Sequence, residues 1–232
     1  MKFEIKYQPS YSMLEVTLES GETITGEAGA LTYMTPNVEV NARARERSIL
    51  GALKTSVLGG QSFFVTDFTA KGGHGKLALV AAPIGDITKL AVAPDKGWIV
   101  ARSGYLASTQ GVNLDVRWEG FSRGIFGQGL FMVKVSGEGD LFVNTFGAID
   151  KHVLDAGEQL VVDNFHLAAF SDTCKYEVRR FGGWKDTILS GEGFVTYIDG
   201  PGEVCVQTKN LREFVDWLWV LLGPRVSTSR SR

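Results

Sequence analysis

The sequence predicts an all-β fold of three repeated β units, followed by one C-terminal α-helix. First, apolar and polar residues alternate with a period of two over most of residues 3 to 208, as in half-buried strands. Second, 28 glycines against 6 prolines supply many turns. Third, three glycine-led stretches recur at nearly constant spacing: GGQSFF at 59–64, FGQGLFMV at 126–133 and SGEGFVTYI at 190–198. Such self-similarity indicates a repeat architecture.

The chain opens with a predicted hairpin, because two alternating segments within residues 3–18 flank Gln8-Pro9-Ser10. The repeats follow, and alignment places Leu31, Leu106 and Leu167 in register. Each unit is expected to contain a strand, a turn, an alternating strand, a charged loop, the glycine-led strand and a further strand or two. The units cover 22–95, 96–156 and 157–209.

Three such units need one another, because a lone sheet leaves one apolar side uncovered. We therefore expect a single β body over residues 1–209, arranged as a sandwich-like prism around a pseudo-threefold axis.

Two segments have helical spacing. Residues 48–58 place four aliphatic side chains on one face, although Gly51 lies inside the segment. Asn210 is expected to cap a second helix over 210–223, which Gly223-Pro224 ends, and residues 224–232 form a mobile tail. Trp217 and Trp219 lie off the main apolar face of this helix. A helix that is apolar nearly all round must be covered by the β body, by a neighbouring subunit or by lipid.

Composition narrows the function classes. A net charge of −2 argues against a dedicated nucleic-acid binder, which needs a surplus of Lys and Arg. Cys174 and Cys205 lie in strand-like runs and read as buried thiols. No export peptide is visible, and the longest apolar run, 214–222, is far shorter than the roughly 20 residues of a spanning helix. We expect a soluble cytoplasmic protein.

No residue pattern indicates catalysis, a cofactor or a metal. The GGHGK run at 72–76 lacks the first glycine and the final hydroxyl residue of a phosphate-binding loop. The histidines, His74, His152 and His166, have no second ligand at a recognised spacing. Glu138 and Asp140 are interpreted as turn residues rather than an acid/base pair. We expect a protein that is not an enzyme.

One polar position recurs in the glycine-led turns, which indicates a structural role, since catalysis seldom needs three copies. The recurring turn residues are Gly60 with Gln61, Gly127 with Gln128, and Gly191 with Glu192.

The charged loops repeat as well, reading NARARERSILGALK at 41–54, RWEGFSRGIFG at 117–127 and RRFGGWKDTIL at 179–189. Arginine beside aromatic residues suits lipid headgroups or phosphate-bearing single strands, whereas an ordinary solvated loop is the alternative. If the loops share one rim, they form a basic ring, and exchanging its arginines for Glu should abolish anionic-lipid binding. The candidate surface residues, including two from the C-terminal helix, are Arg45, Arg123, Arg180, Trp118, Trp184, Trp217 and Trp219.

Several runs together resemble the altered-inheritance-of-mitochondria protein twenty-four family. They are GGQSFF, VAAPIGDI at 80–87, GYLAS at 104–108, GQGLF, SGEGFV, the stretch from Gly157 to Phe170 and GPGEVCVQT at 200–208. The resemblance covers roughly residues 3–222. Gln61 stands where this family usually has Glu, and the Arg/Ser tail is an addition.

This resemblance implies a fold related to the tryptophan-RNA-binding attenuator protein, a short variant of the double-stranded β-helix, repeated within one chain. It also implies homo-oligomerisation and, for the mitochondrial relatives, a role in inner-membrane organisation. For this chain we expect a homo-oligomer, with a trimer as one candidate. It supplies no catalytic residue. Because folds do not fix functions, neither tryptophan nor RNA binding is inferred from it.

The resulting hypothesis is a non-enzymatic, self-assembling β scaffold in the cytoplasm, associated with membrane surfaces or with a membrane-bound partner. The alternative is a small-ligand or nucleic-acid binding module that uses clefts between the repeats. A co-purifying ligand or an excess of absorbance at 260 nm would favour that alternative.

Overall fold

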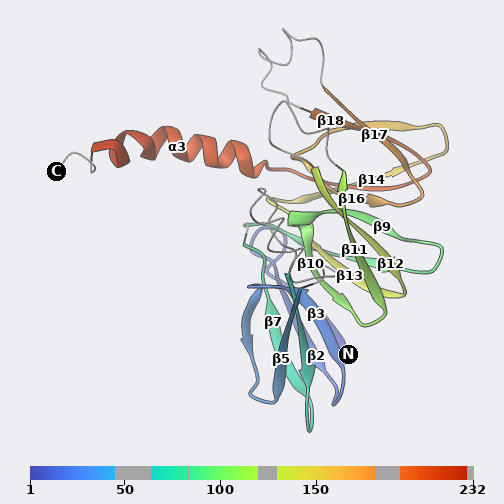
Figure 1. Ribbon diagram of the computed structural model, residues 1–232, viewed down its shortest axis with the longest axis vertical. Helices are drawn as coiled ribbons and strands as arrows, with labels where there is room; N and C mark the ends of the chain where they lie inside the picture. Colours follow the sequence, from blue (N-terminus) through green and yellow to red (C-terminus); the bar gives the residue numbers. More distant parts are fainter. Residues whose placement is uncertain (45–63, 83, 120–129, 181–193, 229–232) are drawn as a thin grey trace.

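The computed structural model describes residues 1–44, 64–82, 84–119, 130–180 and 194–228 (Figure 1). The opening hairpin is confirmed, because β1 (Lys2–Lys6) pairs antiparallel with β2 (Met13–Leu18). Apart from β1, the strands fall into three sets of six, with a short 3-10 helix (Arg102–Gly104) in the second. The predicted helix at 48–58 lies outside the described residues.

Each set of six is one unit. Unit 1 contains β2, β3 (Thr23–Glu27), β4 (Leu31–Met34), β5 (Val38–Ala44), β6 (Phe64–Ala70) and β7 (Gly75–Leu79). Unit 2 contains β8 (Ile87–Val92), β9 (Trp98–Ala101), β10 (Tyr105–Thr109), β11 (Val112–Glu119), β12 (Leu130–Gly137) and β13 (Gly139–Asn144). Unit 3 contains β14 (Ile149–Leu154), β15 (Gln159–Asp163), β16 (Leu167–Ser171), β17 (Lys175–Arg180), β18 (Phe194–Asp199) and β19 (Gly202–Gln207). The ranges aligned from the sequence begin one strand later in each unit.

Strand pairing divides every unit into two half-sheets of three strands. In unit 1 these are β2-β7-β4 and β5-β6-β3, and the other units repeat the pattern. Half-sheets of successive units join edge to edge, β3 with β10 and β9 with β16. The joins produce two six-stranded sheets, β5-β6-β3-β10-β13-β8 and β11-β12-β9-β16-β19-β14. The outermost sheets are β1-β2-β7-β4 and β15-β18-β17.

The repeat alignment needs a correction of one residue in unit 2. Leu31 pairs with Leu79, Tyr105 with Val143 and Leu167 with Val206, and a β-bulge follows each pair. Tyr105, not Leu106, is therefore the counterpart of Leu31 and Leu167. A one-residue slip moves side chains to the opposite face, and where both faces of a strand are buried the sequence does not reveal the slip. Both Tyr105 and Leu106 are fully buried.

The all-β class with a single C-terminal helix is confirmed, but the arrangement around a pseudo-threefold axis is not what the pairing shows. The units stand in a row along the long axis of the molecule, with unit 1 at the bottom of Figure 1 and unit 3 at the top. Among the described strands, β4 and β15 each end a sheet and do not pair with each other. The row still covers apolar faces, because each join lays strands of one unit over the core of its neighbour.

Three apolar clusters form the core, one for each unit, and the clusters continue across the joins. The cluster of unit 1 includes Leu14, Leu77 and Phe68 together with Ala107 and Phe142 of unit 2. At the same join, the Tyr105 hydroxyl donates a hydrogen bond to the Thr25 carbonyl oxygen over 3.2 Å. Each large apolar side chain buried in this way contributes roughly 1.5–3 kcal/mol. The units are thus packed as one body.

The cysteines are buried, as predicted. Cys174 lies in the cluster of unit 3 and Cys205 in that of unit 2, and both are free thiols. Burial raises the pKa of the Cys205 thiol to about 11 and also raises that of Cys174. Both thiols are therefore protonated and unreactive at neutral pH.

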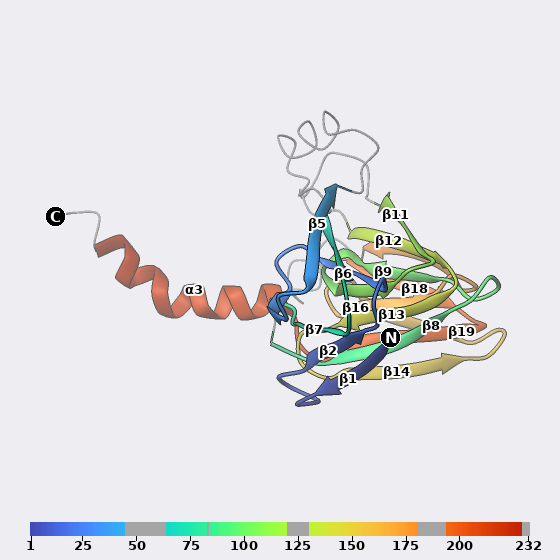
Figure 2. The same ribbon diagram turned by 90° about the horizontal axis from the view of Figure 1, so that it is seen from below.

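The C-terminal helix α3 (Leu211–Thr228) is longer than predicted and points away from the β body (Figures 1 and 2). The expected end at Gly223-Pro224 is wrong, because the helix continues to Thr228, and the predicted mobile tail at 224–232 is helical over its first five residues. Proline removes one helical hydrogen bond, which water can replace where the helix is exposed. Residues 229–232 lie outside the described part of the chain.

Candidate functional site

Helix α3 begins at a well-formed cap. Asn210, which is buried, accepts hydrogen bonds at its side-chain oxygen from the backbone N–H of Arg212 over 2.9 Å and of Glu213 over 3.4 Å. The backbone N–H of Phe214 donates to the Asn210 carbonyl oxygen over 3.1 Å. Asparagine satisfies the free N–H groups of a first helical turn in this way. The predicted capping role of Asn210 is confirmed.

Two aromatic contacts fix the root of α3 to the β body. The ring of Phe214 lies edge-on to that of Phe146, with 5.4 Å between centroids. The guanidinium of Arg212 lies 5.4 Å from the centroid of Phe165. Phe146 itself is held by a hydrogen bond from its N–H to Gln207 Oε1, at 2.9 Å. The first turn is therefore positioned by unit 3 and by the connection that leads into it.

Beyond the first turn and as far as Leu222, the apolar side chains of α3 are exposed, except for the half-buried Leu218. Exposed fractions run from 46% to 73% for a set made up of Val215, Trp217, Trp219, Val220, Leu221 and Leu222. Of the three coverings predicted for this helix, the first, the chain's own body, is not supplied to these side chains by the part of the body that the structure describes. No helix in the described ranges is both long and apolar enough to cross a membrane.

The basic aromatic loops connect counterpart hairpins, β5–β6, β11–β12 and β17–β18. Strands β5 and β11 end on the same side of the molecule in Figure 2. Arg180 ends β17, with its guanidinium 6.0 Å from the centroid of Phe194. Trp118 lies in β11, but its side chain is not described. Arg45, Arg123 and Trp184 lie outside the described residues, so the shared basic rim stays a prediction.

The glycine-led turns cannot be placed either. Gly60, Gln61, Gly127, Gln128, Gly191 and Glu192 all lie in the ranges 45–63, 120–129 and 181–193, which the structure does not describe.

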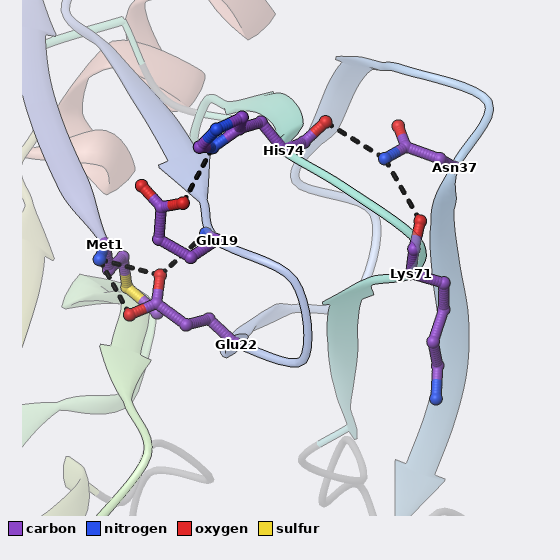
Figure 3. Close-up of polar contacts among 6 residues, drawn as sticks. All are labelled: Met1, Glu19, Glu22, Asn37, Lys71 and His74. Atoms are coloured by element: carbon purple, nitrogen blue, oxygen red, sulfur yellow. Dashed lines mark hydrogen bonds and ion pairs between the residues drawn. The ribbon is translucent and has the colours of Figure 1, made fainter.

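The GGHGK run forms the turn between β6 and β7 (Figure 3). The side-chain amide of Asn37 donates hydrogen bonds to the carbonyl oxygens of Lys71, at 3.3 Å, and of His74, at 2.9 Å. The His74 ring nitrogen Nδ1 lies 2.7 Å from a carboxylate oxygen of Glu19. A strand rather than a helix follows the turn, so the phosphate-cradling geometry is not formed. These residues hold a hairpin in place.

Sequence reasoning missed a polar cluster on the outer face of unit 1. Glu15 is buried and accepts a hydrogen bond from the Tyr33 hydroxyl. Its Oε1 also lies 2.9 Å from the ammonium groups of both Lys6 and Lys76. The Tyr33 hydrogen bond first, and then the two lysines, lower the pKa of Glu15 to about 2. The four residues come from the four strands of one sheet, and the available signal was only that each of them stands in a predicted strand.

The described residues contain no group of three His, Cys, Asp or Glu side chains that could hold a metal ion. His152 contacts Asp150 at 3.1 Å, and the ring of His166 contacts the Gln207 carbonyl oxygen at 2.8 Å. Glu138 lies in the turn between β12 and β13, as interpreted, whereas Asp140 is the second residue of β13. The most distinctive surface is accordingly α3.

Comparisons with known proteins agree with one another. The model of the family described as Mitochondrial biogenesis AIM24 matches residues 3–209. An uncharacterized protein of Streptococcus pyogenes serotype M6 is 30% identical over 225 residues, which span 94% of this chain and 90% of that protein. A crystal structure of a Streptococcus pyogenes protein is similar with a TM-score of 0.80 and 30% identity, covering 95% of this chain and 99% of the other.

Proposed function

The chain belongs to the AIM24 family, and we propose that it is a non-enzymatic, cytoplasmic β scaffold that assembles with its own copies and attaches to membrane surfaces through α3. The observation that carries this proposal is the exposed apolar surface of α3. A helix of this composition is unfavourable in water, since covering each large apolar side chain is worth roughly 1.5–3 kcal/mol. Several such side chains point to a dedicated binding partner.

The composition of α3 favours the boundary between lipid headgroups and acyl chains. Trp217 and Trp219 combine an apolar ring with a polar N–H, and such side chains are enriched at membrane interfaces. The stretch from Phe214 to Leu222, which is apolar except for Asp216, is roughly 14 Å long at 1.5 Å per residue. That length is well short of a bilayer core of about 30 Å. We infer that the helix lies in the interface and does not cross it.

The charged residues of α3 agree with this placement. Three of its four charged residues, Arg212, Glu213 and Asp216, lie in the first two turns, near the β body, and the fourth, Arg225, follows the apolar stretch. The apolar and aromatic side chains follow them toward the C-terminal end. The root of the helix would therefore stay in water while its distal part enters the headgroup region.

The test is flotation with neutral and with anionic liposomes. The full chain is compared with a chain ending at Asn210 and with the double variant W217S/W219S, and native mass is recorded for each. The matched control is Val153→Ser, which removes an equally exposed apolar side chain from the β body. We expect the full chain and the control to float and the other two to stay in solution with unchanged mass.

Two results would contradict the proposal. Flotation of the chain ending at Asn210 would place the lipid contact elsewhere, for example in the basic loops. Loss of assembly on truncation, with no flotation of the full chain, would show that α3 joins subunits instead of contacting lipid.

A further inference from the structure

Among the strands that end a described sheet, two, one at each end of the row, occupy positions that are joined to another unit elsewhere in the chain. Strand β4 ends the sheet β1-β2-β7-β4, and β15 ends the sheet β15-β18-β17. In the other units, the counterparts of these strands are paired on both sides. The counterpart of β4 is β10, which pairs with β13 and also with β3. The counterpart of β15 is β9, which pairs with β12 and also with β16.

The exposed fractions of the side chains show that pairing on both sides buries these positions. Every residue of β16 is buried, whereas every residue of β4 is exposed. Phe170 in β16 is 0% exposed and Met34, its counterpart in β4, is 37% exposed. At the other end, Val161 in β15 is 44% exposed and its counterpart in β9, Ile99, is 9% exposed. The two open edges therefore belong to the strands that correspond to the two partners of each internal join, β3 with β10 and β9 with β16.

Neither edge carries lysine or proline, and the bulge of β4 does not prevent pairing, because its counterparts β10 and β16 have the same bulge and are paired on both sides. Exposed edges are commonly protected by lysine, by proline or by shortened strands. Strand β4 reads LTYM and β15 reads QLVVD, with neither lysine nor proline within them. An unprotected strand edge with apolar side chains is a template for adding another strand.

The internal joins also give the register. Ser108 pairs with Thr25 at the first join, and Phe170 pairs with Ile99 at the second. Transferred to the open edges, the same rule places Met34 opposite Val161, with Tyr33 opposite Val162. Because the bulge follows the first residue of β4 as it does in β10 and β16, this register needs no adjustment in the strand.

We propose that β15 of one copy pairs antiparallel with β4 of a second copy in this register, so that the copies join head to tail. This inference rests on the proposed self-assembly and names its surface. Since the two edges differ, the contact is heterologous: it produces a ring if the rotation closes and a filament if it does not. Each join would complete a sheet in the order β17-β18-β15-β4-β7-β2-β1.

The join between copies is expected to be weaker than the internal joins, because its packed faces are more polar. Leu14 and Val16 of unit 1 belong to the cluster that covers unit 2. By strand register, their counterparts in unit 3 are Asp150 and His152. The outer face of unit 1, which would pack against Asp150 and His152 of the other copy, carries Glu15 and the two lysines that contact it. Because both faces that would pack in this contact carry charged side chains, we expect the contact between copies to be reversible and sensitive to salt.

Cysteine cross-linking tests the register directly. One chain carries Met34→Cys and another carries Val161→Cys, and the two differ in length by a tag. Residues opposite each other in an antiparallel pair have Cα atoms about 4.5–5.5 Å apart, within the range a disulfide spans. Both native cysteines are buried and do not compete. We expect disulfide-linked heterodimers in the mixture and no disulfide-linked dimers from either chain alone.

Lysine variants test whether the edges carry the assembly. Met34→Lys and Val161→Lys should each reduce the native mass to that of a monomer, while the control Val153→Lys, on exposed β14, leaves it unchanged. A monomeric wild-type chain, or a mixture without heterodimers, would overturn the proposal. Disulfide-linked dimers of the Met34→Cys chain alone would replace it with a symmetric β4–β4 contact.

The two proposals fail independently. Lysine at either edge should leave flotation intact, because α3 is unchanged. A chain ending at Asn210 should lose flotation and still form heterodimers in the cysteine mixture.

Discussion

Strands β4 and β16 occupy the same position in their units, yet they end in opposite environments. Both pair on one side with the last strand of their own unit, through the same bulged register. On the other side β16 meets β9, whereas β4 meets no described strand. All of β16 is buried and all of β4 is exposed. The comparison teaches that burial in this protein is set by the join between units and not by the unit alone.

The largest expected difference is in the free energy of unfolding, when the counterpart side chains of β16 and β4 are each truncated to alanine. Phe170→Ala should lower the free energy of unfolding by roughly 3–5 kcal/mol, because a fully buried ring that stacks edge-on against Tyr176 is replaced by a cavity. Met34→Ala should change it by no more than about 0.5 kcal/mol, as for exposed positions. Denaturant unfolding at low protein concentration measures both. Equal losses would mean that β4 is covered in the isolated chain.

A smaller effect is expected from Glu15, which accepts a hydrogen bond from Tyr33 of the edge strand β4. Its pKa is held at about 2, below the ordinary value of 4.5, so the carboxylate stabilises the fold above the ordinary pKa. That contribution is lost as pH falls from about 4.5 toward 2. We expect the melting temperature to fall over this window, and to fall less steeply in Glu15→Gln. Parallel pH profiles for both proteins would contradict the assignment.

The smallest effect on global stability is expected at the root of α3. Asn210→Ala removes the cap and should destabilise the helix by about 1 kcal/mol, lowering the helical signal in circular dichroism. The main unfolding transition should stay in place, since α3 buries little surface against the β body. A matching downward shift of the main transition would show that the helix is part of the cooperative core.

The sequence predicted the β class and the three units, because strand alternation and turn glycines are local properties. It did not predict that the units stand in a row, since alternation does not tell which edge of a strand finds a partner. Once the repeats are aligned by strand register, unit 3 has Asp150 and His152 at the positions of Leu14 and Val16 in unit 1. Polar residues at core positions mark an end of the row.

The candidate site was predicted in part. Asn210 was identified as the cap, because capping depends on local sequence: a suitable residue type directly before a helical pattern. The C-terminal end of α3 was misplaced, since Gly223-Pro224 stops a helix only where the lost hydrogen bond cannot be replaced. Glu15 was missed because its three partners come from three different strands, and their proximity depends on the fold.

The fixed root of α3 has a consequence for avidity. Phe146 and Phe165 hold the first turn, so each chain presents one helix in a set direction and not on a free tether. In a head-to-tail row, the helices would recur at a constant interval and be presented together to a surface. Individually weak contacts then act as one strong contact, because each further binding event is intramolecular. A row of copies would therefore stay on a membrane for longer than a single copy. Separating the copies would shorten that residence, although each copy would still bind through its own unchanged helix.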